Sequence, residues 1–396
     1  MNTIARNGAS PPRPDRSACS ESDDDVGVGV VLHPREELAK LGPFLPKPLY
    51  TLFQAFLTWM TGKAYSGQQP LFAANRYWHL FCALISLFGG VLGSAIVLNG
   101  SPLFLPLLLC SWVFTVGGAR MLQTTINHQC VHKQVFGKMH DRWLSEILST
   151  LLMTSDYETY SGDHLTPHHG LKTFANFEDD PDAKSLRENG LRSGMPKEWY
   201  WKWLWQTMFS PKFHGQFLAS RLAGNFSSKK MYRQWMSVLF YLATIVGVSL
   251  THTWWLFLVA WFFPLTFLYQ VSACLQVASE HLWGHEKDNK HIPNELKSHG
   301  RYCGECPPFG QSMFAWSKFW LRMLFSHLPV RIAILPGELP EHCWHHYHTD
   351  TRNWENGVYE VQKLEETQDI TFVEVWGLDK ALDRVFSHLE KFPPRS

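Results

Sequence analysis

The sequence predicts an all-α integral membrane protein, with four transmembrane helices arranged as two hairpins beneath a cytoplasmic helical cap. Two long stretches, residues 77–119 and 235–279, contain no Asp, Glu, Lys or Arg. Charged residues make up only 18% of the chain, while it holds 18 Trp, a residue that favours the membrane–water interface. The chain also contains 20 His, more than structural roles require.

Each uncharged stretch is about twice as long as one span, which needs roughly 20 apolar residues. Tight turns divide them at Asn99-Gly100-Ser101-Pro102 and at Thr251-His252-Thr253. Inside lipid only helices satisfy their own backbone, so each stretch reads as a helical hairpin. The expected spans are 77–98, 102–120, 235–251 and 254–279. A buried helical core of a soluble protein is the alternative, and two such runs in one chain argue against it.

Both hairpin turns lack Lys and Arg, whereas the flanking segments carry nearly all of them. The positive-inside rule therefore places the turns outside. The N-terminal region, residues 121–234 and residues 280–396 then share the cytoplasmic side and form the cap. We expect a multi-pass protein whose functional site lies on the cytoplasmic face.

The first 33 residues are rich in Pro, Ser and Asp and predict a disordered polar tail, followed by a single membrane domain over residues 34–396. No apolar leader opens the chain, so membrane insertion is expected to come from internal spans. Eight scattered Cys indicate a reducing compartment rather than a disulfide framework. The net charge of +1 gives no reason to expect a nucleic-acid partner.

Three further segments have the composition of helices lying at the membrane surface. Tyr50–Met60 is apolar but half the length of a span. Residues 198–205 and 314–328 combine several Trp with basic neighbours. A soluble core helix is the alternative for the first segment, and packing within the cap is the alternative for the other two.

Four histidine clusters fall on the predicted cytoplasmic side: His128 and His132; His164, His168 and His169; His281 and His285; and His342, His345 and His346. Spacings of three and four residues put two imidazoles on one helix face, where they can hold one ion. In the second cluster, Pro167 is expected in the first turn of a helix capped by Ser161 or Asp163.

Nine or ten imidazoles exceed the four ligands that one zinc ion prefers. Imidazole suits iron, copper, nickel and zinc alike. Two ions with four to five nitrogen ligands each, and an open position for oxygen, fit a di-iron centre best. The cap is therefore predicted to carry a di-metal site.

From about residue 75 to 350 the sequence resembles the membrane fatty acid desaturase and hydroxylase superfamily, which includes the alkane ω-monooxygenases. The similar motifs are HQCVHK from His128, DHLTPHH from Asp163, the DPD run at 180–182, EHLWG from Glu280 and HCWHH from His342. The resemblance implies two irons, O2 as co-substrate, and hydrogen abstraction from an acyl or alkyl chain.

By that resemblance the ligands are nine histidines, with His285 as a tenth ligand or as a hydrogen-bonding neighbour of one: His128, His132, His164, His168, His169, His281, His342, His345 and His346. Nearby carboxylates are expected to orient the imidazoles through hydrogen bonds, and solvated loop charge is the alternative for each. The candidates are Asp163, Asp180, Asp182, Glu280 and Glu341.

The span count and the DPD run favour an acyl desaturase acting on a fatty-acyl or other long-chain lipid. Hydroxylation and oxidative decarboxylation to a terminal alkene remain open, because all three reactions follow the same hydrogen abstraction. A metal transporter is a remote alternative, since the clustered His lie outside the spans. No fused electron-transfer module is visible, so we expect a separate donor of the ferredoxin, rubredoxin or cytochrome b5 type.

One polar stretch, residues 286–312, has no counterpart in the family pattern. Within it, His299, Cys303 and Cys306 have half of a zinc-site spacing. A surface loop is the favoured interpretation of this segment.

Overall fold

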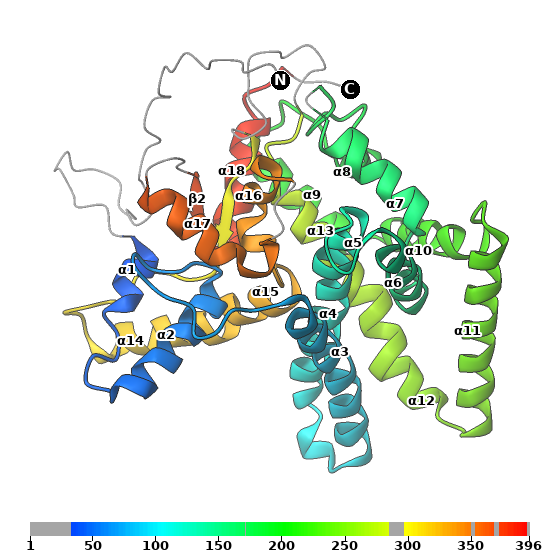
Figure 1. Cartoon of the computed structure of the whole chain (residues 1–396), viewed down its shortest axis with the longest axis horizontal. Coiled ribbons are helices and arrows are strands. Elements are labelled where there is room, and N and C mark those ends of the chain that lie inside the picture. Colours follow the sequence, from blue (N-terminus) through cyan, green and yellow to red (C-terminus); the bar gives the residue numbers. More distant parts are fainter. Residues whose placement is uncertain (1–32, 171, 285–296, 350–352, 368–371, 394–396) are drawn as a thin grey trace.

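The computed structural model describes residues 33–170, 172–284, 297–349, 353–367 and 372–393, and this part of the chain is mostly helical (Figure 1). It also contains a short parallel sheet, in which β1 (Gly300–Tyr302) pairs with β2 (Glu374–Trp376). The prediction of an all-α protein therefore missed this two-stranded sheet. The predicted tail lies outside the described residues except for His33, which is the N-cap of α1 (Pro34–Ala39) and lies 2.8 Å from Glu374.

The first hairpin consists of α3 (Arg76–Asn99) and α4 (Leu107–Met121), joined by a turn with a short 3-10 helix at Pro102–Phe104. Asn75 caps α3 by accepting a hydrogen bond from the backbone N–H of Trp78. The two helices cross closely at glycine: a Cβ on Gly118 would lie 2.2 Å from the backbone nitrogen of Leu87. Small residues at such crossings let helices pack in lipid.

The second hairpin runs from α11 (Met231–Leu250) through a turn at His252, where φ is 54°, into α12 (Trp254–Leu256). The returning helix continues through two π-helical segments, Phe257–Phe262 and Pro264–Leu268, and ends as α13 (Tyr269–Ala278). Figure 1 shows both hairpins projecting to the same side, away from α16 and α18.

Three helices of the described chain are long and apolar enough to cross a membrane: Arg76–Asn99, Met231–Leu250 and Trp254–Ala278. They match three of the expected spans, with α11 beginning earlier than expected. The fourth expected span, 102–120, is divided between the short 3-10 helix and the 15-residue α4. It is not among these three helices, so the count of four stays a prediction.

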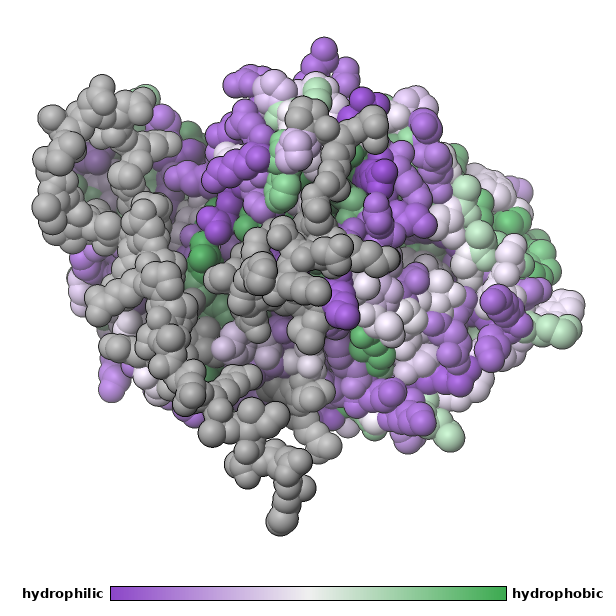
Figure 2. All heavy atoms as spheres, turned by 90° about the horizontal axis from the view of Figure 1, so that it is seen from above, coloured by the Kyte–Doolittle hydropathy of each residue, from purple (hydrophilic) through white to green (hydrophobic). Residues whose placement is uncertain are grey.

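The remaining helices form the cap above the hairpins. Those that precede the second hairpin are α5 (His128–Val131), α6 (Lys138–Leu152), α7 (Tyr157–Asp163), α8 (Pro181–Glu188), α9 (Lys197–Met208) and α10 (Pro211–Phe226). Those that follow it are α14 (Met313–Arg322), α15 (Leu328–Ala333), α16 (His342–Tyr347), α17 (Gly357–Glu366) and α18 (Leu378–Leu389). The coloured part of the face seen in Figure 2 is largely hydrophilic.

The largest core of the cap packs α9 against α13 and α18, with Tyr200, Trp283 and Phe386 fully buried. Within the predicted surface helix at 198–205, Trp203 is buried while Trp205 is 58% exposed. One face of α9 therefore packs within the cap, whereas Trp205 lies on an exposed face.

The segment before the first hairpin packs α2 (Lys47–Thr61) against α14 through Leu57, Phe319 and Met323. The outer faces of both helices expose large apolar side chains, among them Leu49, Leu52, Trp59, Met313 and Phe314. In Figure 1 these helices lie across the direction of α3 and α4. An orientation across the hairpins suits helices that lie at a membrane surface.

Candidate metal centre

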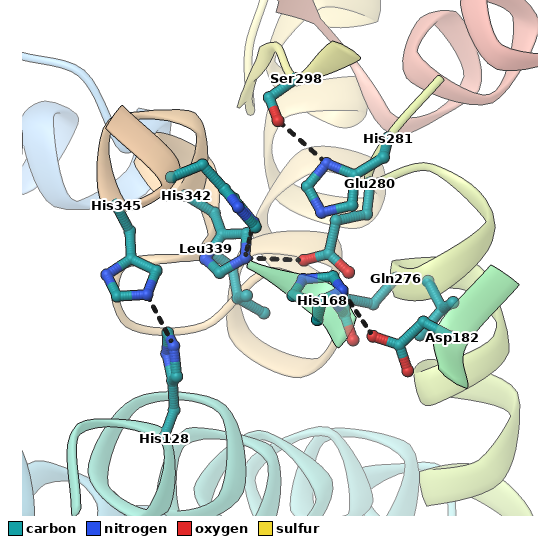
Figure 3. Close-up of polar contacts among 12 residues, drawn as sticks. His128, His168, Asp182, Gln276, Glu280, His281, Ser298, Leu339, His342 and His345 are labelled. Carbon is teal, nitrogen blue, oxygen red and sulfur yellow. Dashed lines mark hydrogen bonds and ion pairs between the residues drawn. The ribbon is translucent and has the colours of Figure 1, made fainter. Parts of the chain in front are cut away.

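The nine predicted imidazoles come together as two neighbouring groups, each of which could hold a metal ion. The first group contains His128, His132, His164, His169 and His345, with candidate ligand atoms all within 4.8 Å of one another. Its Nε2 atoms face each other directly: the distance from His128 to His345 is 3.0 Å (Figure 3), and that from His164 to His132 is 3.1 Å.

The second group contains His168, His281, His342 and His346, within the same 4.8 Å limit. The Nε2 atoms of His342 and His346 are 3.1 Å apart. Each group thus takes ligands from three of the four histidine clusters, and the two groups together use all four. His285 lies outside the described residues, so its predicted role remains a prediction.

Two π-helical segments help to aim these side chains. The first, Leu122–Asn127, connects α4 directly to α5, which begins at His128. The second, His164–His168, continues α7 and contains Pro167. The prediction that Pro167 lies in the first turn of a helix is therefore wrong: the helix begins ten residues before Pro167, at Tyr157, with Asp156 as its N-cap. Pro167 itself has no N–H to donate, and the residues around it form π-type hydrogen bonds, such as that from the His169 N–H to the His164 carbonyl.

Several imidazoles use Nδ1 for a hydrogen bond outside the group, which leaves Nε2 free to act as a ligand. The Nδ1 of His168 lies 3.1 Å from Asp180 Oδ2, and that of His281 lies 3.0 Å from Ser298 Oγ (Figure 3). His281 Nε2 is buried and has no hydrogen-bond partner within the described structure. An orphaned, inward-facing nitrogen of this kind is what a bound cation would satisfy.

Burial keeps most of the cluster neutral. Burial, with the neighbouring histidines, lowers the pKa of His128 to about 4 and that of His169 to about 2. The pKa values of His164, His345 and His346 are also lowered well below the usual range, for the same reasons. Each close pair of neutral Nε2 atoms can share either a proton or a cation, and a bound cation would accept a lone pair from both nitrogens. The donor set therefore fits two metal ions.

His168 differs because a carboxylate lies beside it. Burial alone would lower the pKa of His168, but the charge of Asp180 and its hydrogen bond raise this pKa to about 9. Asp180 is fully buried and also accepts hydrogen bonds from the backbone N–H groups of Ala175 and Asp182. It is thus held in place beside the imidazole that it is predicted to orient.

The other predicted carboxylates divide into three cases. Asp182 Oδ2 lies 3.7 Å from His168 Nδ1, and Glu280 Oε1 lies 3.5 Å from His342 Nε2 (Figure 3). Asp163 is exposed at the end of α7 and makes no ion pair with an imidazole in the described structure, so its predicted orienting role is not supported. Glu341 is buried beside the centre, and burial raises its pKa to about 8.

Three contacts lie beyond the sequence prediction. Glu338 Oε1 lies 3.3 Å from His128 Nδ1 and accepts a hydrogen bond from the Gln129 amide at 2.8 Å. Ser298 supports His281, as described above. Arg301 donates to Glu280 Oε1 at 3.0 Å, and both side chains are buried.

Ser298 and Arg301 fall in the polar stretch that was expected to be a surface loop. That expectation is wrong for its described end, since residues 297–303 are buried and include β1. The suggested zinc half-site gains no support: neither His299 nor Cys303 belongs to a potential metal group of the described chain. Burial raises the pKa of Cys303 to about 12, which disfavours the thiolate that zinc would need.

A cavity of about 520 Å³ adjoins the metal centre. His128, His164, His168 and His342 line one part of its wall, and residues of α4, α7, α8, α9, α10 and α13 line much of the rest, among them Arg120 of α4. Its volume lies within the range of pockets that hold small organic ligands.

The chain matches the family model described as "Fatty acid desaturase" over residues 102–304, slightly more than half of its length. No curated protein and no solved structure shows significant similarity to it. The match includes the first three histidine clusters and ends before the fourth, whose place in the centre comes from the geometry above. Helical architecture, apolar hairpins and this match agree: the chain belongs to the fatty acid desaturase family and is an oxidoreductase of that kind.

Proposed function

We propose that this protein is a membrane di-iron enzyme that uses O2 to remove hydrogen from a fatty-acyl chain, acting as an acyl desaturase. The observation that supports it is the pair of imidazole groups, with five and four members, at the wall of one cavity. Two irons bound there would supply the oxidising power that breaking an unactivated C–H bond requires.

In this proposal the protein holds the nine imidazoles in ligand geometry and fixes their tautomers. Asp180, Ser298 and Glu338 accept from, or face, Nδ1 of His168, His281 and His128, and so keep each Nε2 lone pair directed inward. Burial lowers the pKa values of seven of these histidines, so they stay neutral and the centre would keep a net positive charge: His128, His164, His169, His281, His342, His345 and His346.

The membrane arrangement is part of the same proposal. Four spans, with α4 as the fourth, would put both hairpin turns outside and the cap in the cytoplasm, by the positive-inside rule. The helices α2 and α14 would then lie at the headgroup level through their exposed apolar side chains. A lipid substrate could reach the cavity from the bilayer, and a separate ferredoxin, rubredoxin or cytochrome b5 would deliver electrons from the cytoplasmic side.

The test is expression in a host whose lipids are then analysed by mass spectrometry. Loss of two hydrogen atoms from an acyl chain supports desaturation. Gain of one oxygen atom would show that the enzyme is a hydroxylase and not a desaturase. A volatile hydrocarbon product would show that it is a decarboxylase.

A variant pair ties the product to the centre. His345→Ala removes a ligand from the middle of the first group and should abolish the product and lower the bound iron. His140→Ala alters an exposed histidine outside both groups and should change neither. Product formation persisting in His345→Ala would overturn the di-iron assignment.

A further inference from the structure

One arginine in the wall of the cavity has unused hydrogen-bonding capacity. Arg120 lies in the last turn of α4, and its side chain is buried, with 4% exposure. Its Nη2 donates to Gln276 Oε1 at 2.5 Å, and its guanidinium lies 5.1 Å from the centre of the Tyr269 ring. Its Nε is buried without a hydrogen-bond partner in the described structure.

A second arginine that lines the same cavity has a hydrogen-bond acceptor for each of its three guanidinium nitrogens. Arg221 donates from Nε, Nη1 and Nη2 to the backbone carbonyls of Met153, Leu265 and Leu152. Its guanidinium lies 4.8 Å from the same Tyr269 ring. Two guanidinium groups therefore flank one tyrosine at the cavity, and Arg120 is the one of the two with donors to spare.

The carboxylates of the cavity do not neutralise Arg120. Glu280 is already paired with Arg301 at 3.0 Å, and Asp182 lies beside His168. Glu188, which also lines the cavity, is exposed to solvent. Across the described residues, no carboxylate oxygen lies within 4.0 Å of the Arg120 guanidinium. A buried cation without a counter-charge is costly, and a bound anion removes that cost.

The position of Arg120 relative to the metal centre limits where this anion sits. Residues 107–131 form one continuous helix that carries Arg120 and His128 eight positions apart. At 1.5 Å per residue this separation is roughly 12 Å along the axis. An anion at Arg120 and a carbon at the histidine groups can therefore belong to one small molecule inside the cavity.

We propose that Arg120 binds the carboxylate of a free carboxylic acid, so that the substrate is the acid itself and reacts at a carbon that lies in the same cavity as its head group. This inference rests on the proposed function for the identity of the reaction. Gln276 holds the guanidinium in position, and the unpaired donors of Arg120 receive the carboxylate oxygens. A coenzyme thioester or a phospholipid ester has no negative charge at that point of the chain.

The first measurement compares two ligands on the unaltered protein, purified with its metal in detergent. A saturated fatty acid and its methyl ester of the same length compete for the site against a fluorescent fatty acid. Charge-assisted hydrogen bonds of this kind predict that the acid binds about 10- to 100-fold more tightly than the ester. Equal binding of acid and ester would overturn the proposal, and this result does not depend on any variant folding.

The second measurement uses Arg120→Gln, which removes the charge and keeps a polar side chain of similar length. It should erase the preference for the acid and leave binding of the ester unchanged. The matched control is Arg187→Gln in α8: Arg187 is exposed and lies between the cavity residues Leu186 and Glu188 without lining the cavity itself. A preference that survives in Arg120→Gln, or is lost in Arg187→Gln, would contradict the proposal.

The assignment of Arg120 and the proposed function can be refuted independently. If the protein oxidises a thioester or phospholipid and does not bind the free acid, the assignment of Arg120 is wrong and the desaturase function stands. If the acid binds through Arg120 and no oxidised lipid forms from any substrate, the acid site stands and the proposed function is wrong.

Discussion

Replacing Asp180 by Asn tests whether the carboxylate beside His168 controls the metal centre. The change keeps the shape of the side chain, and Asn is as good an N-cap as Asp, so α8 should retain its cap. It removes the negative charge 3.1 Å from His168 Nδ1. It also turns one acceptor into an NH2 group, which must replace either Oδ2, facing this ring nitrogen and the Ala175 N–H, or Oδ1, facing the Asp182 N–H.

The size of the effect follows from the role of such partners. Loss of a hydrogen-bonding carboxylate behind a metal-binding histidine typically weakens metal affinity 10- to 100-fold. That corresponds to about 1.4 to 2.7 kcal/mol of binding free energy. The assay is iron content after dialysis against a graded series of chelator concentrations, with the same protein fold verified by circular dichroism.

The neighbouring carboxylate supplies the matched control. Asp182 is farther away, with Oδ2 3.7 Å from His168 Nδ1 and a side chain that is 45% exposed. Asp182→Asn should therefore retain more iron than Asp180→Asn at every chelator concentration. If the two variants rank in the opposite order, or if Asp180→Asn retains iron like the unaltered protein, the reasoning is refuted.

Two further predictions concern a neighbour of the centre and the first hairpin. Ser298→Ala leaves the Nδ1 of His281 without its partner, and an unsatisfied buried group costs about 1–3 kcal/mol, so iron retention should fall. Removal of the imidazole in His281→Ala should lower iron retention further. Equal retention in Ser298→Ala and the unaltered protein would show that the contact is dispensable. Gly118→Ala should lower the thermal unfolding temperature in detergent, because its Cβ would lie 2.2 Å from the Leu87 backbone nitrogen and overpacking costs about 1–3 kcal/mol. Gly89→Ala, whose Cβ meets nothing within 4 Å, should leave that temperature unchanged, and an equal loss in both would contradict the close crossing.

The features predicted correctly are those that correspond to a long or strongly patterned segment of the sequence. An uncharged stretch such as 235–279 marks a hairpin because each charge inside lipid is costly. The placing of four clusters on one face followed from topology, and the structure does bring His128 and His345 to within 3.0 Å although they are 217 positions apart.

The features that were missed depend on contacts that no local pattern encodes. Glu338 and Ser298 are single polar residues whose partners come from other segments, and neither stands at a fixed offset from its histidine. The strands β1 and β2 have three residues each, too few for an alternating pattern to be visible. The π turn at His164–His168 was not predicted because the usual rule excludes proline from a helix interior, and Pro167 is an exception to that rule.

The distribution of the histidines along the chain also sets an order of assembly. The first group cannot be completed until His345 has been synthesised, and the second cannot be completed until His346 has been synthesised. Both hairpins are synthesised well before that point. They can enter the membrane before the earlier histidines have their partners from the last cluster. Metal binding would then join histidines that are far apart in the sequence in one late step, as a cross-link does. This step would stabilise a cap that is otherwise incompletely folded. Iron supply would in that case govern how long the newly made protein survives proteolysis, in addition to whether it is active.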